Sequence, residues 1–194
     1  MKEDVSVKII VGISGASGAV YGLRLLERLH SQKEVEIHLI LTRSGEKTLY
    51  LETGKLAADA RQLSDFSYPF EDISCRLASG SYPIDAMVVA PCSIHSMSAI
   101  AHGISSNLLI RAADVTLKER RKLILMVRES PFHLGHLKTM AALAEMGAII
   151  APPIPGFYHH PQTVMDIVDH SVDRVLDLIG RADGRVRRWE GGAQ

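Results

Sequence analysis

The sequence predicts one α/β domain with a central parallel sheet, and two observations lead to this fold class. Short segments rich in Val, Ile and Leu alternate along the chain with longer amphipathic segments, which is the pattern of strands joined by helical crossovers. The 194 residues are 46% hydrophobic and 23% charged, as in an ordinary globular domain with a sizeable core. We therefore expect a single domain that spans residues 1–194.

Five segments have the composition of buried strands, because they are short and apolar on both faces. In chain order they are residues 7–13, 35–41, 85–91, 122–127 and 148–152. Helices are expected over residues 19–31, 44–53, from 93 onward, 106–121, 132–147 and about 162–179. The polar stretch 54–82 predicts a helix, a short irregular section and a loop. The polar tail after residue 180 is either loose or held by Trp189.

Charged residues gather on one face of the first and last predicted helices. In the first, Arg24 and Arg28 fall opposite the apolar face. The last carries an acidic face, formed by Asp166, Asp169, Asp173 and Asp177. Arg174 lies beside that face, at the border of the apolar arc. Either a surface pair with Asp177 or a role for Arg174 inside a pocket explains this placement.

Composition excludes several function classes. The 22 basic and 22 acidic side chains balance, so no overall field attracts nucleic acid or an anionic membrane. No segment approaches the ~20 apolar residues of a membrane span, and no secretory signal is recognisable. Cys75 and Cys92 form no CxxC motif, which fits a reducing compartment, and we expect a cytoplasmic protein. His159 and His160 have no ligand partner one helical turn away, so no metal site is expected.

Ligands bind parallel α/β sheets outside the carboxyl ends of the strands, and this rule selects a set of candidate site residues. The segments that follow the five predicted strands are residues 14–18, Thr42, Cys92–Ser93, Arg128–Glu129 and residues 155–158. They are rich in hydroxyl groups and small residues, and they include one adjacent Arg-Glu pair. We expect all of them to lie along one edge of the sheet.

The stretch GISGASG (residues 12–18) combines a strand end, a small-residue turn and a helix start. It lacks the three-glycine spacing of the dinucleotide fingerprint. Free N–H groups and the helix dipole at such a turn favour a phosphate, and Ser17 is suited to be the N-cap or a hydroxyl donor. A plain tight turn remains the alternative explanation.

Three further motifs also admit two interpretations. Cys92 is better explained as a packing or site-lining residue than as a nucleophile, because no neighbouring residue supplies a base. Arg111 and Lys118 are seven residues apart and share a helix face, where an Asp114–Lys118 pair is the simpler explanation for the lysine. The adjacent Arg128 and Glu129 fit either phosphate binding with proton transfer or a structural ion pair.

Four ordered motifs resemble the UbiX-type flavin prenyltransferases, including the paralogues encoded with phenolic-acid decarboxylases. They are GISGASGA.YGLRLL, APCS…SAIA.GI, NLL.RAADVTLKERR.L.L..RE.P and PGFYHHPQTV.D.V, and the likeness runs from about Lys8 to Trp189. The resemblance implies a three-layer Rossmann-like (flavodoxin-like) flavoprotein. It further implies that the chain joins the prenyl group of dimethylallyl phosphate to N5 and C6 of reduced FMN without a metal. The product, prenylated FMN, serves a UbiD-type decarboxylase, and the family assembles as homo-oligomers, typically dodecamers.

The resemblance also implies roles for individual residues. The implied FMN contacts are Gly15, Ala16, Ser17, Thr42, Ser93, Ile94, His95, Ser96 and Arg111. The implied group around the prenyl phosphate is Lys118, Arg128, Tyr158 and Arg174, with Glu52 nearby and Trp189 closing the pocket. Ser17 and Glu129 match the pair that handles protons. His95 departs from the family pattern, since many relatives carry Lys-Thr or Gly-Thr at positions 95–96.

Two alternative functions remain open at this stage. An FMN-dependent decarboxylase of peptidyl or pantothenoyl cysteine shares the wider fold, but that class needs a histidine near the first helix, where this chain reads GASGAVYGL. A non-catalytic FMN carrier for a decarboxylase is the second alternative. The sequence does not distinguish a monophosphate from a diphosphate prenyl donor, nor does it identify the decarboxylase.

Overall fold

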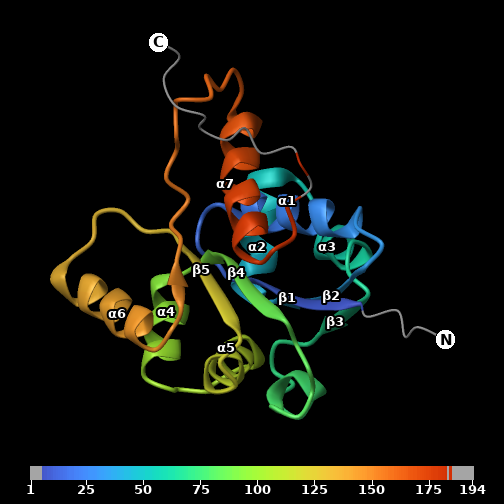
Figure 1. Cartoon of the computed structure of the whole chain (residues 1–194), viewed down its shortest axis with the longest axis vertical. Helices are drawn as coiled ribbons and strands as arrows, with labels where there is room; N and C mark the ends of the chain where they lie inside the picture. The colour runs from blue at the N-terminus through green and yellow to red at the C-terminus, as the bar shows by residue number, and fades with distance from the viewer. Residues whose placement is uncertain (1–5, 183, 185–194) are drawn as a thin grey trace.

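The computed structural model describes residues 6–182 and 184 of the chain. Its centre, in the part described, is a sheet of six parallel strands in the order β3-β2-β1-β4-β5-β6 (Figure 1). The strands are β1 (Val7–Ile13), β2 (Val35–Leu41), β3 (Phe66–Tyr68), β4 (Ala86–Cys92), β5 (Lys122–Val127) and β6 (Ile149–Ile150). The five predicted strands are confirmed, and β3 is an addition from within the polar stretch 54–82.

Helices cover both faces of this sheet, so the three-layer flavodoxin-like architecture is confirmed. The helices are α1 (Ala19–His30), α2 (Arg43–Thr53), α3 (Ala57–Gln62), α4 (Ile94–Ala101), α5 (Leu108–Lys118), α6 (Leu134–Glu145) and α7 (Val164–Leu178), with a 3₁₀ turn η1 (Arg76–Ala78). Figure 1 shows α1, α2, α3 and α7 on one face and α4, α5 and α6 on the other. No helix within residues 6–182 is long and apolar enough to cross a membrane.

Alternating side chains of the buried strands divide the core into two apolar layers. Ile9 and Val11 of β1 pack with Leu26 of α1 and Val172 of α7 on one face of the sheet. Ile10 points to the other face, where the second layer includes residues of α4, α5 and α6. This period of two, combined with burial on both faces, is the reason the strands read as continuous apolar runs in the sequence.

A buried polar cluster attaches the irregular segment between α2 and β4 to the sheet edge. His38 of β2 is fully buried, and its Nδ1 lies 3.0 Å from the hydroxyl of Tyr68 on β3. Its Nε2 lies 2.8 Å from Glu36 Oε1. Burial lowers the pKa of His38, although the Glu36 carboxylate acts in the opposite direction. The contact between His38 and Tyr68 joins residues 30 apart in sequence, which explains why the pattern of residues 54–82 predicts this region poorly.

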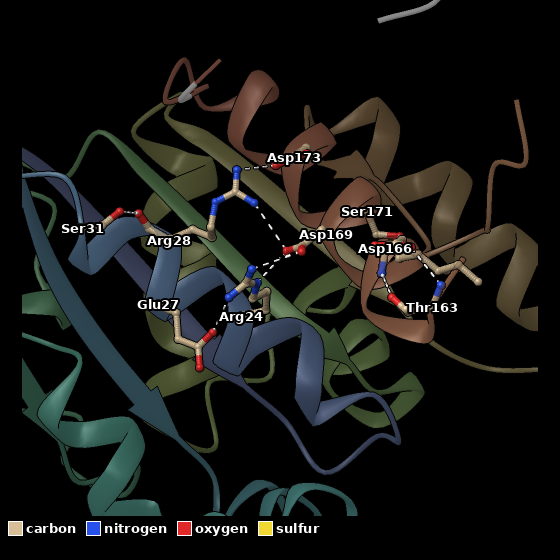
Figure 2. A network of polar contacts seen from close by, with 10 residues as sticks. Arg24, Glu27, Arg28, Ser31, Thr163, Asp166, Asp169, Ser171 and Asp173 are labelled. Atoms are coloured by element: carbon tan, nitrogen blue, oxygen red, sulfur yellow. Dashed lines mark hydrogen bonds and ion pairs between the residues drawn. The ribbon is translucent and has the colours of Figure 1, made fainter. Parts of the chain in front are cut away.

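The charged faces of α1 and α7 pack against each other, which the helical pattern of neither segment indicates. Arg28 of α1 is 3% exposed, and Asp173 of α7 is 6% exposed. Figure 2 shows the arginines of α1 directed at the aspartates of α7. Arg28 therefore lies on the charged face of α1, and the acidic face of α7 covers it.

Candidate functional site

A pocket of about 310 Å³ lies at the carboxyl ends of β1, β2 and β4. Its lining residues are mostly small or hydroxyl-bearing: Ser14, Gly15, Thr42, Arg43, Ser44, Phe70, Ser93, His95, Ser96 and Asn107. The segments that follow these three strands therefore meet at one edge of the sheet, as expected. The volume falls at the lower end of the range for small-molecule sites.

Ser14 joins the two central strand ends that frame this pocket. Its hydroxyl donates to the carbonyl oxygen of Pro91 at 2.7 Å and accepts the backbone N–H of Ser93 at 2.9 Å. Because Ser14 is 1% exposed, these bonds form away from water and hold the loop after β1 against the loop after β4. The spacing between the two flavin loops implied by the resemblance is thus set by a buried serine.

Three helices begin at the pocket, and each has a side-chain cap. Thr42 caps α2 by accepting the N–H of Gly45 at 3.0 Å, and Ser93 caps α4 by accepting the N–H of Ser96 at 3.1 Å. Asn107 caps α5 in the same way. The positive ends of three helix dipoles therefore converge on a site rich in hydroxyl groups, which is an environment suited to a phosphate.

Helix α1 begins at Ala19 as predicted, and of the two roles suggested for Ser17 the structure supports the hydroxyl donor and not the N-cap. Its N-cap is Gly18, at a φ of 102°, and not Ser17. A left-handed φ of this kind favours glycine, because it has no Cβ to clash with the backbone. The Glu52 carboxylate of α2 accepts the N–H groups of Gly18 and Ala19, both at 2.9 Å. These two N–H groups are therefore already bonded to a carboxylate within the chain.

Ser17, Glu52 and Arg128 form one cluster, which brings together three of the predicted site residues. Burial alone would raise the pKa of Glu52, but hydrogen bonds from the Ser17 hydroxyl and the α1 amides lower it, and so does the charge of Arg128. The Arg128 Nε donates to the carbonyl oxygen of Ser17 at 3.1 Å. Glu52 is therefore an ionised hydrogen-bond acceptor at neutral pH, with the Ser17 hydroxyl turned toward it.

Glu129 is exposed beside this cluster and makes no ion pair with its neighbour Arg128 in the part of the chain that is described. Its Oε1 accepts the backbone N–H of Ser130 at 3.0 Å. The alternative of a structural Arg128–Glu129 ion pair is thus excluded in a single subunit. Both side chains remain accessible to a ligand at the carboxyl end of β5.

Tyr158 and Arg174 come from the loop before α7 and from α7 itself. The Tyr158 hydroxyl lies 2.7 Å from Nε2 of His170, which also belongs to α7. Arg174 Nη1 donates to Asp177 Oδ2 at 2.9 Å, so the expected surface pair forms, while more than half of the arginine side chain stays exposed. His170 was not among the predicted site residues, because a single histidine on an acidic helix face does not form a recognisable motif.

Arg111 and Lys118 do not join the others within one subunit. Arg111 Nε donates to the carbonyl oxygen of Ala78 at 3.2 Å, and its Nη1 pairs with Asp114 at 2.7 Å. The expected Asp114–Lys118 pair is therefore wrong, and Lys118 pairs with Glu119 instead. Asp114 is taken by Arg111 because an i,i+3 partner on the same helix face is equally within reach.

The position of Lys118 separates it from the other residues of the implied phosphate group within one chain. Lys118 ends α5, four residues before β5 begins at Lys122, so it lies at the amino end of the sheet. Arg128 directly follows the carboxyl end of the same strand. The six residues of β5 extend about 20 Å at roughly 3.3 Å per residue. The two cations therefore lie at opposite ends of the strand.

Cys92 is fully buried at the end of β4, and burial raises the pKa of its thiol to about 12. A thiol with this pKa is protonated at neutral pH, which favours a packing role for Cys92 over nucleophilic attack. The described residues contain no group of three or more His, Cys, Asp or Glu side chains placed to hold a metal ion. Trp189, the expected closing aromatic, lies outside the described residues.

The pocket also contains residues that the sequence pattern did not select, namely Arg43, Ser44, Phe70 and Asn107. Ser44 explains why residue 15 is a glycine, because a Cβ there would lie 2.4 Å from the Ser44 Cβ. Asn107 could have been found as an N-cap before an apolar helix. Phe70 comes from the irregular segment, where no periodicity marks it. Hydroxyl groups, helix N-termini and one aromatic ring together match the chemistry of a flavin nucleotide.

Comparisons with known proteins identify the family. A model of the Flavoprotein family matches residues 1–176. Flavin prenyltransferase UbiX of Salmonella typhimurium (strain LT2) is 51% identical over 186 residues, which cover 95% of this chain and 98% of that protein.

Two solved structures have the same fold over almost their whole length. A dodecameric FMN-dependent UbiX-like decarboxylase from Escherichia coli O157:H7 has a TM-score of 0.94 and 45% identity, covering 95% of this chain and all of the other. AnUbiX (PadA1), in complex with FMN and dimethylallyl pyrophosphate, has a TM-score of 0.94 and 38% identity, covering 96% and 99%. Fold, pocket and family model define a flavoprotein. Within that class, the chain belongs to the flavin prenyltransferase family of UbiX.

Proposed function

We propose that this protein is a flavin prenyltransferase that joins the dimethylallyl group of dimethylallyl phosphate to N5 and C6 of reduced FMN. Its product is prenylated FMN, the cofactor of a UbiD-type decarboxylase. The observation that carries the proposal is the pocket at three helix N-termini with the Ser17–Glu52–Arg128 cluster beside it. That arrangement occurs in a chain 51% identical to a flavin prenyltransferase.

The flavin pocket binds FMN through backbone groups and hydroxyls. Gly15, Ala16 and Ser17 offer the turn after β1, and Thr42 and Ser93 open two of the capped helices. The remaining proposed FMN contacts are Ile94, His95, Ser96 and Arg111. Bound reduced FMN supplies the two nucleophilic atoms, N5 and C6. The chain holds the ring so that these atoms face the prenyl donor.

Arg128, Tyr158 and Arg174 bind the phosphate of the donor. When the C–O bond of the ester breaks, phosphate leaves with the electron pair, and guanidinium groups stabilise the charge that develops. Lys118 completes this set from a neighbouring subunit, because it lies at the far end of β5 in its own chain. The protein therefore acts as a homo-oligomer with sites at subunit contacts, and we infer a dodecamer.

Protons are handled by Ser17 and Glu129. Bond formation at N5 and at C6 would release a proton from each atom, and we propose the exposed Glu129 carboxylate at the end of β5 as the base that accepts them. One proton would then go to the leaving phosphate. The other would go to the prenyl double bond, which must gain a proton before it can form its second bond to the flavin. Ser17 donates its hydroxyl proton toward Glu52, which keeps the Ser17 oxygen oriented at the pocket edge. We place the reaction in the cytoplasm, in line with the free thiols.

The test is incubation of the protein with reduced FMN and dimethylallyl phosphate, followed by mass spectrometry of the extracted flavin. A flavin heavier by one five-carbon prenyl unit supports the proposal. Unmodified flavin that stays tightly bound supports a non-catalytic carrier. A parallel reaction with the diphosphate ester identifies the preferred donor.

A further inference from the structure

We propose that Arg28 is a positioning residue for the phosphate end of the active site. It holds α7 in one position along α1, and α7 in turn holds Tyr158 through His170 and presents Arg174. The inference rests on the proposed function, because it assigns Tyr158 and Arg174 to the prenyl phosphate. Arg28 is not itself a proposed ligand contact, and it acts through α7, which it binds at Asp169 and Asp173.

The contact between the two helices is a buried network of ion pairs, which Figure 2 shows. Arg28 Nη2 lies 2.5 Å from Asp173 Oδ1, and both side chains are less than a tenth exposed. Arg28 Nη1 also lies 3.4 Å from Asp169 Oδ1. Arg24 binds the same Asp169 with two nitrogens, at 2.6 Å and 3.1 Å. Two arginines one helical turn apart thus bind two aspartates one turn apart.

Such a network specifies position more than it stabilises. Removing two charges from water costs several kcal/mol, and a well-packed apolar pair of similar volume is often equally stable. The apolar contacts between the helices, such as Val172 against α1, are non-directional and tolerate a shift along the helix axis. Charged groups paired at defined angles do not tolerate such a shift. The apolar contacts therefore hold α7 against α1, and Arg28 fixes the position of α7 along the axis of α1.

Helix α7 passes this position to the loop that carries Tyr158. His170 lies on α7 between Asp169 and Asp173, and its Nε2 is 2.7 Å from the Tyr158 hydroxyl. The His159 ring stacks on His170 at 4.4 Å with an angle of 9° between the ring planes. Residues 151–163 have no regular secondary structure, and Tyr158 and His159 join this segment to α7 through His170. A shift of α7 moves Tyr158 accordingly.

The same shift moves Arg174, because this residue directly follows Asp173 in the helix. By contrast, the flavin pocket is built from the ends of β1, β2 and β4 and from α2, α4 and α5. None of these elements is attached to the sheet through α7. Loss of the network should therefore weaken binding of the prenyl phosphate and leave FMN binding intact. A general loss of stability would weaken the binding of both ligands.

The test is the double variant Arg28→Met with Asp173→Leu, which replaces both members of the buried pair with apolar groups while Asp169 keeps its contacts with Arg24. We expect thermal stability equal to or above that of the parent and FMN affinity within about twofold of it. The KM for dimethylallyl phosphate should rise by roughly 10- to 100-fold, the effect of a misplacement of about 1 Å. Calorimetric titration of dimethylallyl phosphate into the FMN-loaded protein measures the same loss without turnover.

Val172→Ala is the matched control, because it weakens apolar docking of α7 but keeps both ion pairs. It should lower thermal stability and leave the KM unchanged. A folded double variant with the parental KM overturns the role of Arg28, and so does an equal rise of KM in Val172→Ala. Should the double variant fail to fold, Asp173→Asn is compared with Val172→Ala by the same criterion. If the parent binds no dimethylallyl phosphate, the proposed function fails instead.

Discussion

The Glu52 carboxylate of α2 lies 2.9 Å from the backbone nitrogen of Gly18, the first residue of the α1 N-terminus. One helix thus supplies the cap of another, at a glycine that has no side chain to cap its own helix. The contact joins the turn at residues 14–18 to α2, and the N-terminus of α2 lines the pocket. Two sides of the pocket are therefore connected through one carboxylate.

Glu52→Gln should destabilise the protein by about 0.3–1 kcal/mol at pH 7, because the charge at the helix N-terminus is lost. The pKa of Glu52 is lower in the folded than in the unfolded chain, so its contribution is complete above the unfolded value of about 4.3. That contribution disappears as the pH falls through the folded pKa. Denaturant unfolding of both proteins between pH 7 and pH 3.5 should show a gap that closes on acidification. A gap that widens would contradict this assignment.

Glu129→Gln should keep FMN bound but slow prenyl transfer by about 10²- to 10⁴-fold, the usual value of a general base. The substitution preserves shape and removes the ionisable carboxylate. Flavin absorbance measures binding, and mass spectrometry of the flavin measures transfer. Glu145→Gln on α6 serves as the control for the loss of one negative charge. Parental turnover in Glu129→Gln would remove this residue from the proton steps.

Arg174→Ala should weaken dimethylallyl phosphate binding by about 1.5–3 kcal/mol, roughly 10- to 150-fold, with little change in FMN affinity. The reason is the loss of a charged donor to phosphate from a helix that does not line the flavin pocket. Calorimetric titrations of the two ligands provide the comparison, with Lys138→Ala on α6 as the charge control. Equal loss of both ligands would indicate a structural role for Arg174.

Lys118→Ala and Arg128→Ala should each abolish activity alone, yet coexpression of the two variants should restore part of it. If one site takes Arg128 from one subunit and Lys118 from a neighbour, random mixing leaves about a quarter of the sites intact. Purified mixed oligomers, carrying different affinity tags, are assayed for prenylated flavin. No recovery in mixed oligomers would place both cations in a site formed by a single chain, against the separation along β5.

Cys92→Ala should retain prenyl transfer and lose only about 1 kcal/mol of stability, as expected for a buried thiol that packs and does not react. Burial raises its pKa to about 12, so the reactive thiolate is scarce at neutral pH. Turnover and thermal unfolding are measured on the same preparation. Loss of turnover in a variant that still binds FMN would make Cys92 part of the chemistry.

The sheet and most of the helices could be predicted because burial on both faces leaves a strong apolar signal in β1, β2, β4 and β5. The edge strand β3 could not, since Phe66 and Ser67 are exposed and no alternation marks its three residues. Its place depends on Tyr68 meeting His38, a contact between segments 30 residues apart. Local pattern carries no information on such partners.

The meeting of Ser17 and Arg128 could be predicted, because both belong to segments that follow parallel strands at the same edge of the sheet. Lys118 shows the limit of residue spacing, because a shared helix face with Arg111 does not say which end of the sheet it occupies. Arg28 shows a second limit. The sequence of a charged helix face does not reveal whether water or an oppositely charged helix covers it. In this structure α7 covers the charged face of α1.

The separation of Lys118 from Arg128 has a consequence for working concentration. If Lys118 serves a neighbouring subunit as proposed, a lone folded copy holds its flavin pocket but carries an incomplete set of cations for the ester. Diluting the protein until copies dissociate should therefore extinguish transfer while leaving flavin retention unaffected, and the lost rate should return on reconcentration without refolding. The proposed arrangement therefore makes the rate of prenyl transfer depend on the concentration of the protein itself as well as on the concentrations of FMN and the prenyl donor.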